Sequence, residues 1–138
     1  MSTPWRPPEV GDIAWCQFPE WPDRKGPGPK PGPALVLSVV IREDGVAVRV
    51  AYGTSQRVDR LKSGEFAILR NASAPAFELA GLALDTKFNL KDVVELPWSD
   101  RYFKVPPRAR HGQSPKLGTL HAALMRAAKA AHDAASGR

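Results

Sequence analysis

The chain has 138 residues, the size of one average domain, and its 43% hydrophobic and 25% charged residues are typical of a folded globular protein. No apolar run reaches the roughly 20 residues that cross a bilayer. The first residues, MSTPWRPPEVGD, lack the apolar core of a secretory signal, so we expect a cytoplasmic protein that does not enter the membrane. The single cysteine, Cys16, excludes an internal disulfide and a thiolate zinc site.

The net charge of +6 is concentrated at one end of the chain. Residues 101–138 carry eight basic side chains against one acidic, a net charge of +7, whereas residues 1–100 carry 12 basic and 13 acidic side chains. A basic segment of this kind favours a polyanion such as RNA or DNA. A solvated tail that only aids solubility has the same charge, so composition leaves both interpretations open.

The first third of the chain is rich in proline. Residues 1–10 contain three prolines and predict an irregular lead-in. Alternation in residues 12–18 predicts a short strand, with Cys16 as a small core residue rather than a reactive thiol. Residues 19–33 carry six prolines, which forbid both helix and strand, so we expect a long loop. Such a loop is often functional, although a disordered connector has the same composition.

A β-hairpin is expected over residues 34–52. Residues 34–41 are almost wholly apolar and β-branched, like a strand buried on both faces, and residues 46–52 alternate cleanly. Gly45 suits the turn between them because it adopts a positive φ without strain. Short strands at this spacing predict a mainly β domain over residues 11–100, a small barrel or sandwich. The further strands are expected at 56–61, 65–69, 82–90 and 93–96, with a helical turn at 74–80.

The pattern after Trp98 is that of a linker and a helix. Residues 101–113 contain Pro106 and Pro107 and predict a linker. Ser114 and Pro115 suit the N-cap and first position of a helix, which we expect over residues 114–136. Its apolar stripe should pack on the barrel or across a homodimer, leaving a basic face to attract RNA. The stripe is Leu117, Leu120, Leu124, Ala127, Ala128 and Ala131, and the basic residues are Lys116, Arg126 and Lys129.

A metal centre is not expected. The three histidines are His111, His121 and His132, and on one helix the last two would lie roughly 16 Å apart, too far for one ion. The glycine-rich run in residues 26–33 does not predict a phosphate loop either. Its prolines lack the N–H groups that cradle a phosphate.

The remaining polar residues suit metal-free cleavage of RNA. That reaction requires a group that activates the 2′-hydroxyl, a cation for the charged transition state and small donors that hold the phosphate. Thr54 and Ser55 follow a buried strand and could present hydroxyls at a barrel rim, while Asp85 and Lys87 lie two apart on an expected strand and would share a face. The alternatives are turn capping for the first pair and a solvated surface pair for the second. Cations on the proline-rich loop are Arg24, Lys25 and Lys30.

The order of these segments resembles the MazF/PemK (Kid, CcdB-like) toxin superfamily over about residues 11–98. Residues 11–18, GDIAWCQF, are similar to the family's opening G-D-(I/L)-x-W/Y-x-x-F strand, and residues 33–38, PALVLS, to its R-P-x-(L/V)-V-(L/I)-S strand. Residues 54–56, TSQ, stand where the family carries a polar T-(S/T/A)-Q stretch. Residues 81–85, GLALD, resemble its late strand, which often carries an acidic residue.

The resemblance implies an SH3-like small barrel, usually a homodimer, that cleaves single-stranded RNA without a metal or other cofactor. It also implies inhibition of translation and neutralisation by a small acidic antitoxin. By position, Thr54 and Ser55 would orient the phosphate and Asp85 would lie in the active-site groove. The family's arginine before the strand proline, a principal catalytic residue, falls at Gly32. Either a loop cation replaces it, or the protein no longer cleaves RNA.

We therefore expect a toxin-type endoribonuclease with an SH3-like barrel and a C-terminal helix. Its expected catalytic residues are Thr54, Ser55, Asp85 and Lys30, and its expected RNA-binding residues are Arg24, Lys25, Gln56 and Lys87. One alternative is an SH3-like module that binds RNA or a protein partner without cleaving it. Another is a DNA-associated accessory protein that uses the basic tail.

Overall fold

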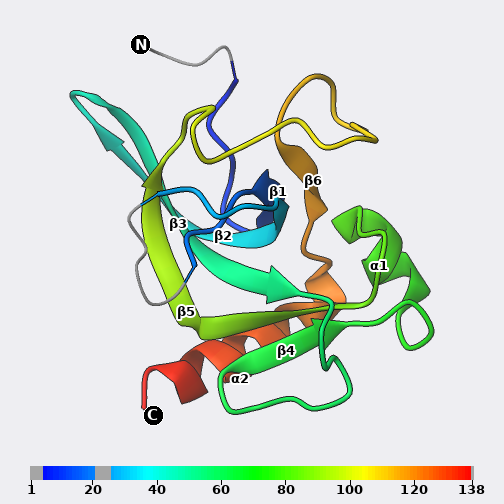
Figure 1. Cartoon of the computed structure of the whole chain (residues 1–138). Coiled ribbons are helices and arrows are strands. Elements are labelled where there is room, and N and C mark those ends of the chain that lie inside the picture. Colours follow the sequence, from blue (N-terminus) through cyan, green and yellow to red (C-terminus); the bar gives the residue numbers. More distant parts are fainter. Residues whose placement is uncertain (1–4, 21–25, 138) are drawn as a thin grey trace.

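The structure is a computed structural model that describes residues 5–20 and 26–137, and within them the chain forms one six-stranded sheet with two α-helices (Figure 1). The strands are β1 (Asp12–Cys16), β2 (Gly32–Arg42), β3 (Gly45–Thr54), β4 (Glu65–Ile68), β5 (Thr86–Pro97) and β6 (Lys116–Thr119). The helices are α1 (Ala74–Ala80) and α2 (Met125–Ala135), and a 3-10 turn, η1 (Ala122–Leu124), leads into α2.

The sheet is antiparallel throughout, in the order β4-β5-β3-β2-β1-β6. The register between β3 and β5 shifts between Ala51 and Tyr52, and β5 bends sharply in Figure 1, as strands do at a β-bulge. The expected mainly β fold with a C-terminal helix is confirmed. The sheet is not closed into a barrel, because β4 and β6 remain its two edges.

The expected hairpin is confirmed in detail. Arg42 of β2 pairs with Gly45 of β3, which leaves a two-residue turn of Glu43 and Asp44. Gly45 has a φ of 135°, a conformation that side chains rarely adopt. The hairpin therefore forms where local alternation and turn chemistry agree.

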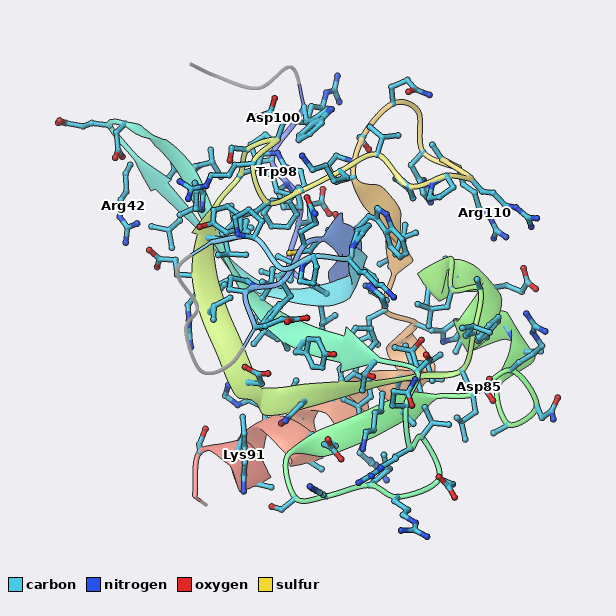
Figure 2. The ribbon with its side chains drawn as sticks, viewed as in Figure 1. Arg42, Asp85, Lys91, Trp98, Asp100 and Arg110 are labelled. Carbon is cyan, nitrogen blue, oxygen red and sulfur yellow. The ribbon has the colours of Figure 1, made fainter. Side chains whose placement is uncertain are left out.

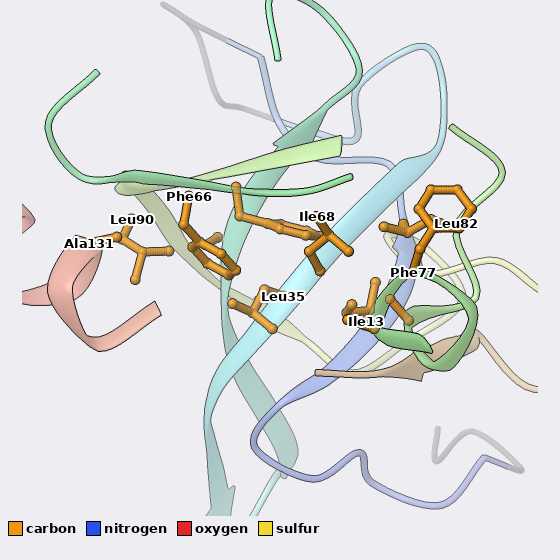
Figure 3. Packing of buried hydrophobic residues seen from close by; sticks show 12 residues of the cluster. Ile13, Leu35, Phe66, Ile68, Phe77, Leu82, Leu90 and Ala131 are labelled. Carbon is orange, nitrogen blue, oxygen red and sulfur yellow. The ribbon is translucent and has the colours of Figure 1, made fainter. Parts of the chain in front are cut away.

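Hydrophobic clusters cover both faces of the sheet, because neighbouring strand residues point to opposite sides. On one face, Leu35 and Phe66 pack with Phe77 of α1 and Ala131 of α2 (Figure 3). The other face holds Cys16, whose burial raises the thiol pKa to about 12, so the thiol is an inert core group as expected. This second cluster consists of Ala14, Cys16, Phe18, Ala34, Val36, Val48, Val50, Leu96, Trp98 and Phe103.

The expected helix over residues 114–136 is wrong in its first half. Residues 116–119 form β6, which pairs with β1, and α2 begins only at Met125. The free edge of β1 offers these residues a ladder of backbone hydrogen bonds that a helix would leave unused. Gly118 fits there because its backbone lies against α1, where a Cβ would collide with the carbonyl oxygen of Leu79. The apolar stripe still packs on the core, as Leu117, Leu120 and Leu124 do.

One other expected strand is wrong, and a second, expected over residues 82–90, begins only at Thr86. Residues 55–60 form turns instead of a strand. Residues 82–85 form a bend, so that Asp85 precedes β5 instead of lying on it, and β5 then continues unbroken to Pro97. Residues 98–114 have no regular element, but Phe103 is fully buried and bridges to Cys16, which holds this segment against β1. None of the helices in the described part of the chain is long and apolar enough to cross a membrane.

Candidate functional site

The end of β3 and the start of β5 lie side by side at one end of the sheet (Figure 1). Thr54 pairs with Lys87 of β5, and Lys87 pairs in turn with Ala67 of β4. Residues that are directly opposite in an antiparallel pair point to the same face. Thr54 and Lys87 therefore share a face, and Asp85 follows at the same end of the sheet, two residues before Lys87.

Gly32 joins this row. Ala34 and Tyr52 form the last pair of the β2–β3 ladder, so Gly32 and Thr54 each lie two residues beyond that pair at the same end of the two strands. The two strands are in close contact there, because a Cβ at Gly53 would collide with the carbonyl oxygen of Pro33. A Cβ at Gly32, by contrast, would meet no described atom within 4 Å. Position 32 thus faces open space at the same end of the sheet as Thr54.

Lys87 is buried beneath the 55–64 loop. Its Nζ donates to Glu65 Oε1 at 3.0 Å and to the Arg60 carbonyl oxygen at 3.1 Å, and both charged side chains are only 7% exposed. Burial acts to raise the Glu65 pKa, but the Lys62 backbone N–H and the Lys87 ammonium outweigh it and leave that pKa below its usual value. The Lys87 charge is thus neutralised by Glu65, and the solvated surface pair with Asp85, which the sequence left open as an alternative, is replaced by this buried pair.

Thr54, Ser55 and Gln56 form a tight turn at the end of β3. The Gln56 backbone N–H donates to Thr54 Oγ1 at 3.1 Å, an arrangement that threonine often adopts in turns. The Thr54 hydroxyl proton stays free to donate elsewhere. Ser55 and Gln56 are exposed, and their side chains have no hydrogen bond within the described part of the chain.

Asp85 lies in the bend before β5 and is labelled in Figure 2. Its Oδ1 accepts the Arg70 backbone N–H at 2.8 Å. The Arg70 side chain lies over the Phe77 ring, 4.7 Å from its centroid, and donates to the Ala83 carbonyl oxygen. Asp85 therefore caps the backbone after β4 with one oxygen, and its other oxygen has no hydrogen-bond partner among the described residues.

The loop cations are only partly described. Lys30 is exposed two residues before Gly32, and its side chain has no hydrogen bond or ion pair to a described residue. Arg24 and Lys25 lie outside the described residues. The loop is attached to the sheet by Gln17, which exchanges hydrogen bonds with Gly28. Among the described residues no cluster of acidic, histidine or cysteine side chains could hold a metal ion.

Tyr52 is a site residue that sequence reasoning missed. It lies two residues before Thr54 on the same face, is 38% exposed and packs beside Phe18, with 5.2 Å between the ring centroids. An exposed aromatic ring beside phosphate donors is suited to stacking against a nucleic acid base. The alternation of residues 46–52 was the available signal, because it places Tyr52 on the face opposite to Ala51.

Comparison with known proteins identifies the fold but not a family. No protein-family model matches the chain, and no curated protein does. Among solved structures, the chain is similar to an endoribonuclease in complex with its cognate antitoxin from mycobacterial species. The TM-score is 0.57, the sequence identity is 19%, and the match covers 94% of this chain and 95% of that chain. At this identity the likeness establishes a common fold over nearly the whole length.

Proposed function

We propose that the protein is a toxin-type endoribonuclease that cleaves single-stranded RNA without a metal ion. The observation that carries the proposal is the row at the end of β3, where Tyr52, Thr54 and open position 32 share one face and Asp85 lies at the same end. The fold shared with an endoribonuclease supports it. The proposal includes a homodimer in the cytoplasm that is neutralised by a small acidic antitoxin.

In this proposal the side chains divide the reaction among them. The Thr54 and Ser55 hydroxyls donate to the phosphate, and the free carboxylate oxygen of Asp85 takes the proton of the 2′-hydroxyl. The 2′-oxygen then forms a bond to phosphorus, the bond from phosphorus to the 5′-oxygen breaks, and the leaving 5′-oxygen takes a proton from water. Lys30 supplies the cation that stabilises the charged transition state in place of an arginine at position 32. Tyr52 stacks against a neighbouring base. The exposed residues Gln56, Arg24 and Lys25 hold the RNA strand.

Lys87 takes a different part from that expected of it. Its ammonium is buried and bound to Glu65, so it cannot reach RNA from its present position. By holding the Arg60 carbonyl oxygen it fixes the loop that begins with Ser55 and Gln56. In the proposal Lys87 is therefore a positioning residue and not an RNA ligand.

A second candidate is a module of the same fold that binds RNA or a protein partner without cleaving it. Two observations favour it. Glycine at position 32 supplies no charge, and both Thr54 Oγ1 and Asp85 Oδ1 accept backbone N–H groups, as ordinary turn residues do. The third candidate, a DNA-associated accessory protein, has only the basic charge of the C-terminal segment in its favour.

The decisive experiment is incubation of the full chain with single-stranded RNA in EDTA, followed by sequencing of the cut ends. We expect cleavage that survives EDTA and falls roughly 100- to 1,000-fold in Lys30→Gln, the usual loss for a transition-state charge contact. Thr54→Ala and Asp85→Asn should also lower the rate, whereas Glu43→Gln at the hairpin tip should not. RNA binding without cleavage would favour the second candidate, and rescue only by magnesium would contradict a metal-free reaction.

A gain of function would sharpen the result. Because no described atom lies within 4 Å of a Cβ at Gly32, Gly32→Arg should fold normally and place a guanidinium in the row with Thr54. We expect this variant to cleave faster than the unmodified chain. Ile41→Arg adds the same charge at the distant, 78% exposed hairpin and should leave the rate unchanged. Equal rates in all three proteins would argue against a role for position 32.

A further inference from the structure

A second candidate site lies at the other end of β5. A cavity of about 340 Å³ opens between the N-terminal segment, β1 and the segment after β5, a volume in the range of small-molecule sites. Figure 2 shows Trp98, which lines it, far from Asp85. The cavity is lined by Trp5, Arg6, Pro7, Pro8, Glu9, Asp12, Ala14, Trp98, His111, Gln113, Ser114 and Lys116.

Two tryptophans form its aromatic wall. The Trp98 ring is 7% exposed, packs against Phe103 and donates its Nε1–H to the Arg6 carbonyl oxygen at 3.1 Å. Trp5 meets Trp98 edge to face, with 6.0 Å between the ring centroids, and stays partly exposed. The buried ring thus fixes the partly exposed ring, which offers a flat apolar surface for stacking.

Several polar side chains around this wall have no partner among the described residues. The side chains of Arg6, His111 and Gln113 make no hydrogen bond or ion pair with any described residue. Lys116 Nζ lies 3.5 Å from Asp12 Oδ1, a long ion pair, and is 36% exposed. Asp12 itself is occupied, because its Oδ2 accepts the Glu9 backbone N–H at 2.9 Å. The groups without a partner among the described residues are therefore the Arg6 guanidinium, the Glu9 carboxylate, the His111 imidazole and the Gln113 amide.

The chemistry of the wall selects one class of ligand. A hydrocarbon would leave the Arg6 guanidinium and the Gln113 amide without a ligand group to bind, and a bare anion would leave the two indole rings without a stacking partner. A flat ring that carries a negative group uses both, and the Gln113 amide can donate to and accept from a base edge. The neighbouring segment of residues 98–111 carries four basic residues and one acidic residue, which attracts a phosphate backbone.

We propose that this cavity binds one nucleotide, with its base stacked on Trp5 and its phosphate near Arg6, His111 and Lys116. The site is separate from the Thr54 row, because β5 has 12 residues and the two sites lie beyond its opposite ends. The proposal does not depend on whether the chain cleaves RNA. The nucleotide is either free or part of a strand.

The test titrates AMP and UMP into the full chain and follows the tryptophan indole N–H signals by NMR. We expect a saturable shift of the Trp5 and Trp98 signals. Trp5→Ala should weaken binding roughly 5- to 150-fold, the usual loss per stacked base, and Arg6→Gln should weaken it several-fold. Trp15→Phe, outside the cavity, is the matched control and should bind as the unmodified chain does.

A single-stranded DNA octamer of thymidines distinguishes a free nucleotide from one that is part of a strand. It lacks the 2′-hydroxyl, so the protein cannot cleave it by the proposed reaction. If the ligand is a strand, the octamer should bind more tightly than TMP and its affinity should depend more steeply on salt. Arg6→Gln should then reduce the slope of log affinity against log salt concentration by roughly one. Equal affinity for octamer and TMP identifies a free nucleotide. The absence of a saturable shift, or wild-type affinity in both Trp5→Ala and Arg6→Gln, would overturn the proposal. If the unmodified chain binds AMP but does not cleave RNA, that result would count against the proposed function and not against this nucleotide site.

Discussion

The polar side chains at the two ends of β5 differ in whether they have hydrogen-bond partners within the protein. At its start, Thr54, Asp85 and Lys87 each bind a backbone group or a buried partner. Beyond its other end, the side chains of Arg6 and His111 surround a cavity and have no partner among the described residues. The residues that match the sequence motifs thus stabilise turns through hydrogen bonds. The side chains without partners lie instead in segments that match no sequence motif.

This contrast limits what the Thr54 end can do. Thr54 uses an oxygen lone pair for its turn, so its proton remains available to a phosphate, and Asp85 keeps one oxygen for a 2′-hydroxyl. Lys87 differs, because its ammonium is buried and bound to Glu65 and to the Arg60 carbonyl oxygen. A reaction at this end therefore depends on a cation from elsewhere, which makes Lys30 and position 32 the informative places for substitution.

The largest effect is expected from the buried ion pair. Glu65→Gln leaves the Lys87 ammonium buried without a counter-charge, which should lower the free energy of unfolding by about 4 kcal/mol at pH 7. Urea unfolding followed by circular dichroism would measure it. The double variant Glu65→Gln with Lys87→Met removes both charges and should recover most of the loss. A loss below about 1 kcal/mol in the single variant would mean that this end is not held by the pair.

The same pair predicts a pH dependence. The Glu65 pKa is lowered in the folded protein, so the unfolded state binds more protons in acid. The stabilising contribution is full above the unfolded pKa of about 4.3 and is lost as the pH falls through the lower, folded value. Unfolding curves between neutral and acidic pH should fall less steeply for Glu65→Gln than for the unmodified chain. Parallel curves would contradict the pKa shift.

Two glycines in the same region give the next largest difference. A Cβ at Gly53 would collide with the Pro33 carbonyl oxygen and lie 2.8 Å from the Phe88 ring, whereas one at Gly32 meets nothing described within 4 Å. Gly53→Ala should cost about 3 kcal/mol through overpacking, and Gly32→Ala should change stability by less than about 0.5 kcal/mol. Thermal unfolding of both variants measures the difference. Equal losses would show that position 32 is not open.

Local pattern was sufficient to predict the sheet but not its edge. The hairpin follows from alternation and Gly45, which are properties of neighbouring residues. Residues 116–119 form β6 because β1, about a hundred residues earlier, offers a free edge and α1 lies against Gly118. No local signal reports either condition. Ser114 and Pro115 do form a sequence that is typical of a helix start. The prediction was nevertheless wrong, because the tertiary structure offers these residues a strand partner instead.

The candidate site was predictable in part for the same reason. Thr54, Ser55 and Asp85 do come to one end of the sheet, because strand ends are readable from turn residues. The burial of Lys87 was not predictable, because it depends on the path of the 55–64 loop and on Glu65 of the neighbouring strand β4. The cavity between Trp5 and Trp98 joins residues 93 positions apart, and only the folded chain brings them together.

A smaller effect is expected at Asp85. Asp85→Ala leaves the Arg70 N–H without its acceptor and should cost about 1 kcal/mol. Asp85→Asn keeps an acceptor oxygen and should cost less, while it removes the proposed proton acceptor for the 2′-hydroxyl. Chemical unfolding together with RNA cleavage separates the two parts that Asp85 plays. If Asp85→Asn loses as much stability as Asp85→Ala, its effect on cleavage could not be assigned to chemistry.

The smallest effects on stability are expected at the cavity. The His111 and Gln113 side chains make no hydrogen bond or ion pair with any residue that the structure describes. Their replacement therefore breaks nothing, and His111→Gln and Gln113→Ala should shift the free energy of unfolding by less than about 0.5 kcal/mol. Both should nevertheless weaken AMP binding, because groups that stabilise nothing in the free protein remain available to a ligand. A stability loss above about 1 kcal/mol in either variant would remove the contrast between the two ends of β5, since the cavity residues would then be structural as well.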